Sequence, residues 1–201
     1  QNRPLPTDRM TVKEAWIIAI STGFAGVGIL CYLNLLTGLL GLISLILYAW
    51  IYTPLKQKTS WSVFVGAFPG ALPPMIGWIA YTGELGPAAF SLFALQFIWQ
   101  FPHFWAIAWR LDEDYKKAGF IMLPSGGEKN KQSAFQILFY TIFMIPISLI
   151  PMLPMFNVGG FLSVIAAIVC GVIMLKPALK LYQTLDDKYA TKLMFASFLY
   201  L

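Results

Sequence analysis

The sequence predicts an all-α protein that crosses a membrane several times as one polytopic transmembrane helical bundle. Hydrophobic residues make up 58% of the 201 residues, charged residues make up only 11%, and the mean hydropathy is +0.69. Soluble domains carry about 25% charged residues, so this composition excludes an ordinary soluble protein. Apolar runs of about 20 residues recur, and in lipid such runs form helices, whose backbones satisfy their own hydrogen bonds. Residues 1–201 therefore read as a single transmembrane domain.

Six apolar runs are long enough to be complete spans, and a seventh is partial. In chain order they are Glu14–Leu33, Leu35–Thr53, Ser62–Tyr81, Pro87–Trp109, Ser133–Leu153, Gly159–Leu181 and the run that starts at Thr191. The third run contains three prolines and three glycines, which predict either a kinked packing helix or the wall of a cavity. Because the chain starts at Gln1 and stops inside an apolar run, we expect both ends to be truncated.

Basic residues gather on one side of the predicted bundle. If the connections alternate between two sides, all fourteen Lys and Arg lie on the side of the N-terminus. The connections on the opposite side contain one charged residue, Glu84. The positive-inside rule makes the basic side cytoplasmic, or the matrix side in an organelle. Topology thus explains the net charge of +5, and no nucleic-acid partner is expected.

The most polar stretch within these apolar runs is Gln96–Pro124. As one continuous helix it would project a stripe of polar side chains within a narrow sector: Gln96, Gln100, His103, Arg110 and Asp114. Ionisable groups in a membrane normally face a protein interior or a cavity, because exposure to lipid is costly. The stripe therefore predicts a functional cavity beside this helix.

Three acidic residues, Asp112, Glu113 and Asp114, end the stripe. At the C-terminus of a helix such a cluster is unfavourable, because the helix dipole is negative there, and a cation would relieve it. Mg²⁺ takes one or two carboxylates and fills its other positions with water and substrate phosphate. The alternative is a solvated boundary of charged residues without a ligand.

His103 and Lys56 each allow more than one interpretation. His103 can be an interior histidine with satisfied hydrogen bonds, a proton donor or acceptor, or a ligand to a haem iron. Lys56 ends the phrase YTPLK, and it is either a membrane anchor or a partner for a diphosphate.

Five motifs together resemble a known family. In order they are NRPLP (Asn2–Pro6), YTPLK (Tyr52–Lys56), GALPPMIGW (Gly70–Trp78), WQFPHFWAIA (Trp99–Ala108) and DYKKAGFIMLP (Asp114–Pro124). The sequence resembles the protohaem IX farnesyltransferase (haem O synthase) branch of the UbiA-type intramembrane prenyltransferases, and the motifs cover nearly all of it.

The resemblance implies a bundle of nine helices around a central cavity, of which seven are expected here. Two N-terminal helices with a first aspartate-rich motif, and the end of the last helix, would be missing, so we expect the 201 residues alone to be inactive. The implied reaction transfers the farnesyl group of farnesyl diphosphate to the 2-vinyl group of haem B, with Mg²⁺, and yields haem O for haem-copper oxidases. The implied location is the bilayer of the cell inner membrane, or of the mitochondrial inner membrane, with an oxidase-assembly factor or haem A synthase as a partner.

The resemblance also implies residue roles. Asp114, with Asp112 and Glu113 as helpers, would hold the metal; the catalytic set would be Asp114, Lys56 and Tyr115; substrate binding would fall to Trp99, His103, Arg110 and Lys117. Two alternatives are a sister prenyltransferase for a quinone precursor or chlorophyllide, and a haem-carrying membrane subunit or transporter. The PHFW phrase at Pro102–Trp105 weighs against the first, and the lack of an inverted repeat or of a second axial ligand weighs against the other.

Overall fold

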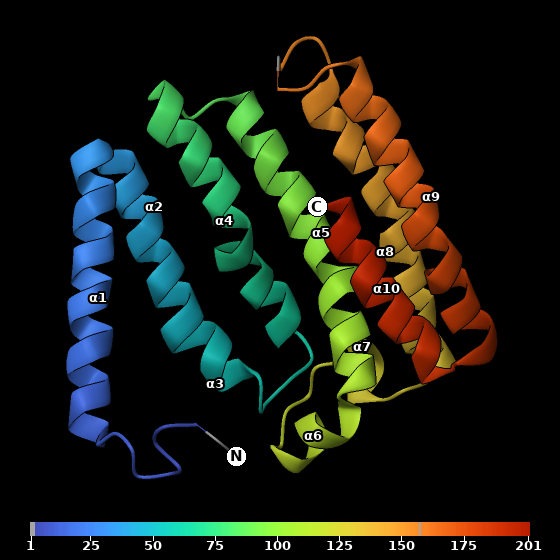
Figure 1. The fold of residues 1–201 in the computed structure, drawn as a ribbon, viewed down its shortest axis with the longest axis horizontal. Helices are drawn as coiled ribbons and strands as arrows, with labels where there is room; N and C mark the ends of the chain where they lie inside the picture. The colour runs from blue at the N-terminus through green and yellow to red at the C-terminus, as the bar shows by residue number, and fades with distance from the viewer. Residues whose placement is uncertain (1–2, 157) are drawn as a thin grey trace.

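The computed structural model describes residues 3–156 and 158–201, and this part of the chain is helical with no strand (Figure 1). Asn2, the first residue of the NRPLP motif, lies outside the described residues. Five helices in the described part are long and apolar enough to cross a membrane. The fold class predicted from composition is confirmed, and the protein is a multi-pass membrane protein.

The first layer of the bundle is built from α1, α2 and α4. α1 (Val12–Leu33) begins at a capping box, in which Thr11 and Glu14 each accept a hydrogen bond from the other's backbone. α2 (Leu35–Ile46) continues through a π-helical segment (Leu47–Tyr52) into α3 (Thr53–Leu55). α4 (Ser62–Thr82) holds the three interior prolines.

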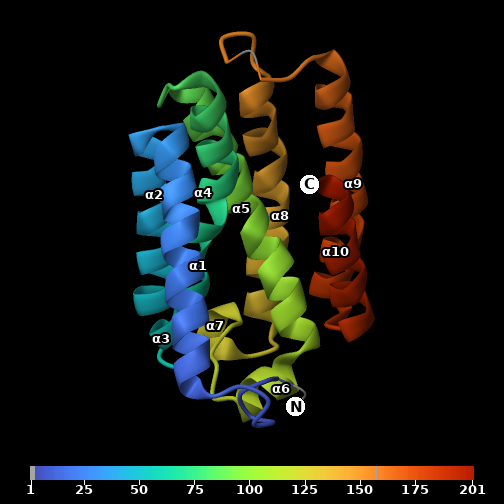
Figure 2. The ribbon, with the colours of Figure 1, turned by 60° about the vertical axis from the view of Figure 1, so that its left-hand side comes forward.

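The second layer is a four-helix group. It consists of α5 (Pro87–Arg110), α8 (Lys131–Leu149) with a 3₁₀ turn at Ile150–Met152, α9 (Phe161–Thr184) and α10 (Asp187–Tyr200). Two short helices, α6 (Asp112–Lys117) and α7 (Pro124–Gly127), connect α5 to α8. α5 is the central element, because it contacts α4 on one side and α8 and α10 on the other (Figures 1 and 2).

The connections alternate between the two ends of the bundle, as predicted. The N-terminal segment, α3, α6, α7 and the α9–α10 junction lie together at the lower end in Figure 1. The α1–α2, α4–α5 and α8–α9 connections lie at the other end. The lower end carries the basic residues of the sequence, and we call it the basic end.

The seven predicted spans correspond to the seven long helices, and their bounds shift by a few residues. α5 is not among the five most apolar spans although it has 24 residues, because its polar side chains interrupt the apolar run. These side chains lie inside the protein rather than against lipid: Gln100 and His103 are both buried.

Candidate active site

The C-terminal half of α5 presents side chains to three different surroundings. Gln100 and Phe104 line a cavity shared with α4 and the π-helical segment. Phe101 and Trp105 line a second cavity, shared with α4, α7 and α8. His103 faces α10. The single polar stripe expected from the sequence is therefore divided among separate environments.

The first cavity has a volume of about 330 Å³. Its lining residues come from α2, the π-helical segment, α4 and α5: Ser44, Leu45, Tyr48, Tyr52, Val63, Gly66, Pro69, Gly70, Gln100 and Phe104. π-helical turns within α-helices are frequent at functional sites. Ser62–Tyr81 was open to two interpretations, a kinked packing helix or a cavity wall, and the lining of the first cavity by Val63, Gly66, Pro69 and Gly70 supports the cavity wall.

Two glycines of α4 allow its neighbours to approach the helix. A Cβ atom at Gly66 would stand 2.6 Å from the Tyr52 ring, and one at Gly70 would stand 2.0 Å from Gln100 Oε1. The Gln100 amide donates hydrogen bonds to the Ala67 carbonyl (3.0 Å) and to the Gln96 carbonyl (3.2 Å). Gln100 thus bonds α5 to α4 at the cavity wall.

The prolines of α4 leave carbonyl groups without their helical partners, and a neighbouring helix compensates for one of them. Pro73 has no N–H to bond the Pro69 carbonyl four residues before it. Ser44 on α2 donates its hydroxyl to that carbonyl at 3.3 Å. The kinked helix is therefore fixed to α2 on one side and to α5 on the other.

Lys56 lies beside the aromatic residues of the first cavity. Its Nζ is 4.2 Å from the centroid of the Tyr52 ring and 5.7 Å from that of Tyr48. Burial, and secondly the positive charge of Arg3, lower the pKa of Lys56. Its carbonyl accepts a hydrogen bond from the Ile121 backbone at 2.8 Å. The structure thereby joins the YTPLK motif to the segment that follows α6.

The acidic cluster does not end α5, contrary to the expectation. α5 stops at Arg110, the backbone turns at Leu111 (φ −103°, ψ 24°), and Asp112 begins the separate helix α6. Carboxylates at a helix N-terminus interact favourably with the helix dipole, so no cation is required to relieve them. Asp114 therefore does not continue the face of α5 that carries Gln100 and His103.

The three carboxylates also have different surroundings. Asp112 pairs with Lys116 at 3.1 Å, and Lys116 also pairs with Glu128 at 3.1 Å. These hydrogen bonds raise the pKa of Lys116. Asp114 is exposed and forms no ion pair within the described part of the chain. No three His, Cys, Asp or Glu residues among residues 3–156 and 158–201 converge into a metal cluster.

Three further predicted site residues lie at the basic end. Tyr115 is half-buried on α6 and packs near Phe120, with ring centroids 6.2 Å apart, and burial raises its pKa. Arg110 and Lys117 are exposed. Neither forms a salt bridge with a described residue.

His103 and Trp99 form a pair at the contact between α5 and α10. Their rings stack with centroids 4.5 Å apart and an interplanar angle of 16°. His103 Nδ1 lies 2.7 Å from Ser197 Oγ, and Trp99 Nε1 donates to the Ser197 carbonyl at 2.8 Å. Sequence reasoning missed Ser197, because it stands in an apolar run 94 residues away from His103 and belongs to no motif.

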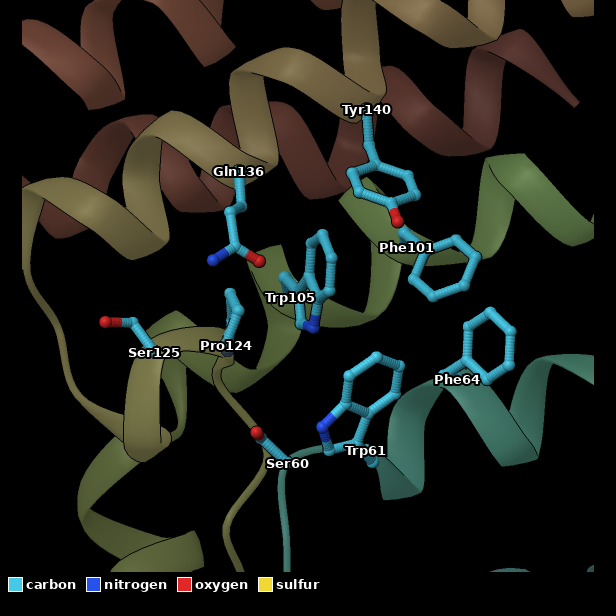
Figure 3. A pocket seen from close by; sticks show the side chains of 9 residues that line it. All are labelled: Ser60, Trp61, Phe64, Phe101, Trp105, Pro124, Ser125, Gln136 and Tyr140. Carbon is cyan, nitrogen blue, oxygen red and sulfur yellow. The ribbon is translucent and has the colours of Figure 1, made fainter.

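The second cavity has a volume of about 210 Å³ and opens beside the α4 N-terminus (Figure 3). Its lining residues are Ser60, Trp61, Phe64, Phe101, Trp105, Pro124, Ser125, Gln136 and Tyr140. The indole nitrogen of Trp105 points toward Trp61 in Figure 3. It is the only buried side-chain nitrogen or oxygen in the described residues that lacks a hydrogen-bond partner. The sequence motifs do not assign this cavity a role.

Comparison with known proteins identifies the family. The model of the UbiA prenyltransferase family matches residues 1–200. A protein named protoheme IX farnesyltransferase from Cytophaga hutchinsonii is 48% identical over 201 residues, which is all of this chain and 70% of that protein. Proteins of the same name from Flavobacterium psychrophilum and Christiangramia forsetii are also 48% identical, over all of this chain and 67% of each relative. No solved structure matches. The chain therefore belongs to the UbiA prenyltransferase family.

Proposed function

We propose that the protein transfers the farnesyl group of farnesyl diphosphate to the 2-vinyl group of haem B and so produces haem O. The observation that carries this proposal is the 48% identity, over the whole chain, to proteins named protoheme IX farnesyltransferase. A transporter or haem-carrying subunit is disfavoured, because the matching family model is that of prenyltransferases.

The chemistry is an exchange of one bond for another at the first carbon of the farnesyl chain. The bond from this carbon to the diphosphate breaks, and the terminal vinyl carbon of haem B forms a new bond to it. Water adds to the resulting cation and a proton is released. Departure of the diphosphate develops negative charge on its oxygens, so groups that stabilise this charge lower the barrier.

The proposed diphosphate position is the basic end, where Lys56 lies beside the first cavity. Its ammonium group supplies positive charge, and the aromatic and apolar lining of the cavity suits an isoprenoid chain. Asp114 fits as a Mg²⁺ ligand, because its carboxylate is exposed and outside the ion pairs formed by Asp112. Mg²⁺, when bound, neutralises charge on the leaving diphosphate.

Glu113 and Tyr115 are proposed to assist Asp114 and Lys56 from α6. Asp112 is proposed to support the metal site through its pair with Lys116. Arg110 and Lys117 add positive charge at the same end, where substrate phosphate and haem carboxylates can bind. Trp99 and His103 are proposed to contact haem B from the α5–α10 contact.

The proposed orientation places the basic end on the cytoplasmic side of the cell inner membrane, or on the matrix side of the mitochondrial one. Haem O is then available to the assembly of haem-copper oxidases, with an assembly factor or a haem A synthase as the expected partner. Labelling with membrane-impermeant reagents in sealed vesicles tests this orientation. Lys116 and a cysteine introduced in place of Glu84 must be labelled from opposite sides of the membrane.

An acceptor competition tests the proposed substrate. The complete gene product that contains these 201 residues is incubated in membranes with farnesyl diphosphate, haem B and an aromatic quinone precursor together. We expect farnesylation of haem B alone by mass spectrometry. Farnesylation of the quinone precursor with haem B unchanged would refute the haem assignment and favour the sister prenyltransferase.

A further inference from the structure

A groove runs between α9 and α10 at the basic end, and it shares no lining residue with the two cavities described above. Its volume is about 320 Å³. Three exposed lysines line it, two from α9 and one from α10, and we call them the groove lysines: Lys176, Lys180 and Lys192. Two helices therefore bring three positive charges to one groove.

The positive charge of the groove is not neutralised within the described part of the chain. The acidic residues nearest to the groove lysines along the sequence pair with other lysines: Asp186 with Lys188 at 2.7 Å, and Asp187 with Lys129 at 2.8 Å. The groove lysines form no salt bridge with residues 3–156 or 158–201. Two of them stand four residues apart on α9, where like charges destabilise a helix. An anion bound between them would relieve this repulsion.

The groove becomes apolar farther from the basic end. α9 runs toward that end and α10 runs away from it (Figure 1). Ile173 precedes Lys176 and Ala196 follows Lys192, and both apolar residues line the groove. Each lies about one helical turn deeper in the bundle than the lysine of its own helix. Positive charge above an apolar channel matches a phospholipid, whose phosphate lies above its acyl chains.

An aromatic side chain marks the level of the membrane surface in this groove. Tyr189 is half-buried in the groove lining, and its ring centroid lies 5.7 Å from Nζ of Lys192 and 5.0 Å from Nζ of Lys188. Tyrosine is enriched where a membrane meets water, because its ring is apolar and its hydroxyl is polar. The groove lysines therefore stand at the depth of the lipid head groups.

We propose that the α9–α10 groove binds an anionic phospholipid, with the groove lysines around its phosphate and Ile173 and Ala196 against an acyl chain. Basic pockets between transmembrane helices on the cytoplasmic or matrix side bind the head groups of such lipids. Free phosphate would use the lysines but not the apolar depth. A zwitterionic lipid carries no net negative charge for the lysines to attract. The site is independent of the proposed farnesyl transfer.

Native mass spectrometry of the complete gene product that contains these 201 residues tests the groove. The protein is purified in detergent and mixed with equal amounts of phosphatidylglycerol and phosphatidylcholine. We expect the unaltered protein to retain phosphatidylglycerol preferentially. In Lys176→Gln/Lys180→Gln/Lys192→Gln the tightest phosphatidylglycerol site should weaken about 100-fold, which is about fivefold for each lysine removed.

A second triple variant controls for the loss of charge. Lys13→Gln/Lys58→Gln/Lys131→Gln removes three exposed lysines that lie outside the groove lining and form no salt bridge with a described residue. It should keep the tightest phosphatidylglycerol site. Equal phosphatidylglycerol binding by the two triple variants would overturn the proposal.

The apolar depth of the groove distinguishes a lipid from other ligands that carry phosphate. Ile173→Trp fills this depth and leaves the groove lysines in place, so it should weaken phosphatidylglycerol binding. Val172→Trp, at an exposed neighbouring position outside the groove lining, should not. Inorganic phosphate and farnesyl diphosphate, each at the concentration of the lipid, should fail to displace it. Displacement by either compound, or equal lipid binding by the two tryptophan variants, would refute a phospholipid site.

Discussion

The side chain of Gln100 lies directly against the backbone of Gly70, where an added Cβ would stand 2.0 Å from Gln100 Oε1. The same amide donates to the Ala67 carbonyl, so the α4–α5 contact depends on the absence of a side chain at residue 70. This pair defines the wall of the first cavity, and the motifs that contain these two residues are therefore joined in space.

Gly70→Ala should destabilise the protein by about 1–3 kcal/mol, because it overpacks a well-fitted contact. The measurement is thermal unfolding in detergent. Gly77→Ala is the control on the same helix, since nothing lies within 4 Å of its Cβ position. The double variant Gly70→Ala/Gln100→Ala should recover part of the loss. Equal melting temperatures for Gly70→Ala and Gly77→Ala would contradict this packing.

Lys56→Gln should raise the KM for farnesyl diphosphate about 10- to 100-fold, which corresponds to the loss of one hydrogen bond to a charged group. Lys58→Gln, two residues away, is the control. Steady-state kinetics at varied farnesyl diphosphate measure the effect. A KM that stays unchanged in Lys56→Gln would leave Lys56 as a membrane anchor only.

The same lysine should make binding depend on pH. Its pKa is lowered from 10.5, so Lys56 is charged below that lowered pKa and loses its charge as the pH rises through it. The affinity for farnesyl diphosphate should therefore decline at a lower pH than for an ordinary lysine. Titrations of binding against pH check this, and Lys56→Gln should lack that part of the decline.

Asp114→Asn should abolish Mg²⁺-dependent turnover while the protein remains inserted and folded. The carboxylate is the group that Mg²⁺ requires, and asparagine keeps the shape without the charge. Asp186→Asn is the control, because Asp186 is another acidic residue at the basic end and pairs with Lys188 at 2.7 Å. Activity that still rises with Mg²⁺ in Asp114→Asn, to the level of the unaltered protein, would exclude the metal role.

Asp187→Ala should destabilise the protein by about 1–3 kcal/mol, because it leaves the fully buried Trp109 indole without its partner. Asp187 also pairs with Lys129 at 2.8 Å and so ties α10 to the segment before α8. Unfolding of the single variants and of Asp187→Ala/Trp109→Phe forms a double-mutant cycle. Additive effects would show that the two side chains do not interact.

The long helices and the basic end were predictable from the sequence, because both depend on local properties. An apolar run of sufficient length must form a helix in lipid, and charged residues mark where each helix leaves it. For α4 the sequence left a packing helix and a cavity wall both open. Gly66 and Gly70 were the signal for the wall, because their missing side chains let Tyr52 and Gln100 approach the helix.

The division of the polar stripe was not anticipated, although a signal for part of it was present. The order DEDYKK places acids first and lysines last, which is the charge pattern of a new short helix. The partnership of His103 with Ser197 carried no such signal. It depends on how α10 packs on α5, and tertiary packing of this kind cannot be derived from the spacing within either helix.

In the proposed reaction, this protein joins a farnesyl group to haem B. Its most direct test is incubation of the complete gene product with haem B, Mg²⁺ and farnesyl diphosphate labelled with ¹³C in the farnesyl chain, followed by mass spectrometry of the extracted haem. We expect a haem that carries the intact labelled farnesyl group and one added water. Haem B recovered without label, from protein shown to be folded and to bind farnesyl diphosphate, would contradict it.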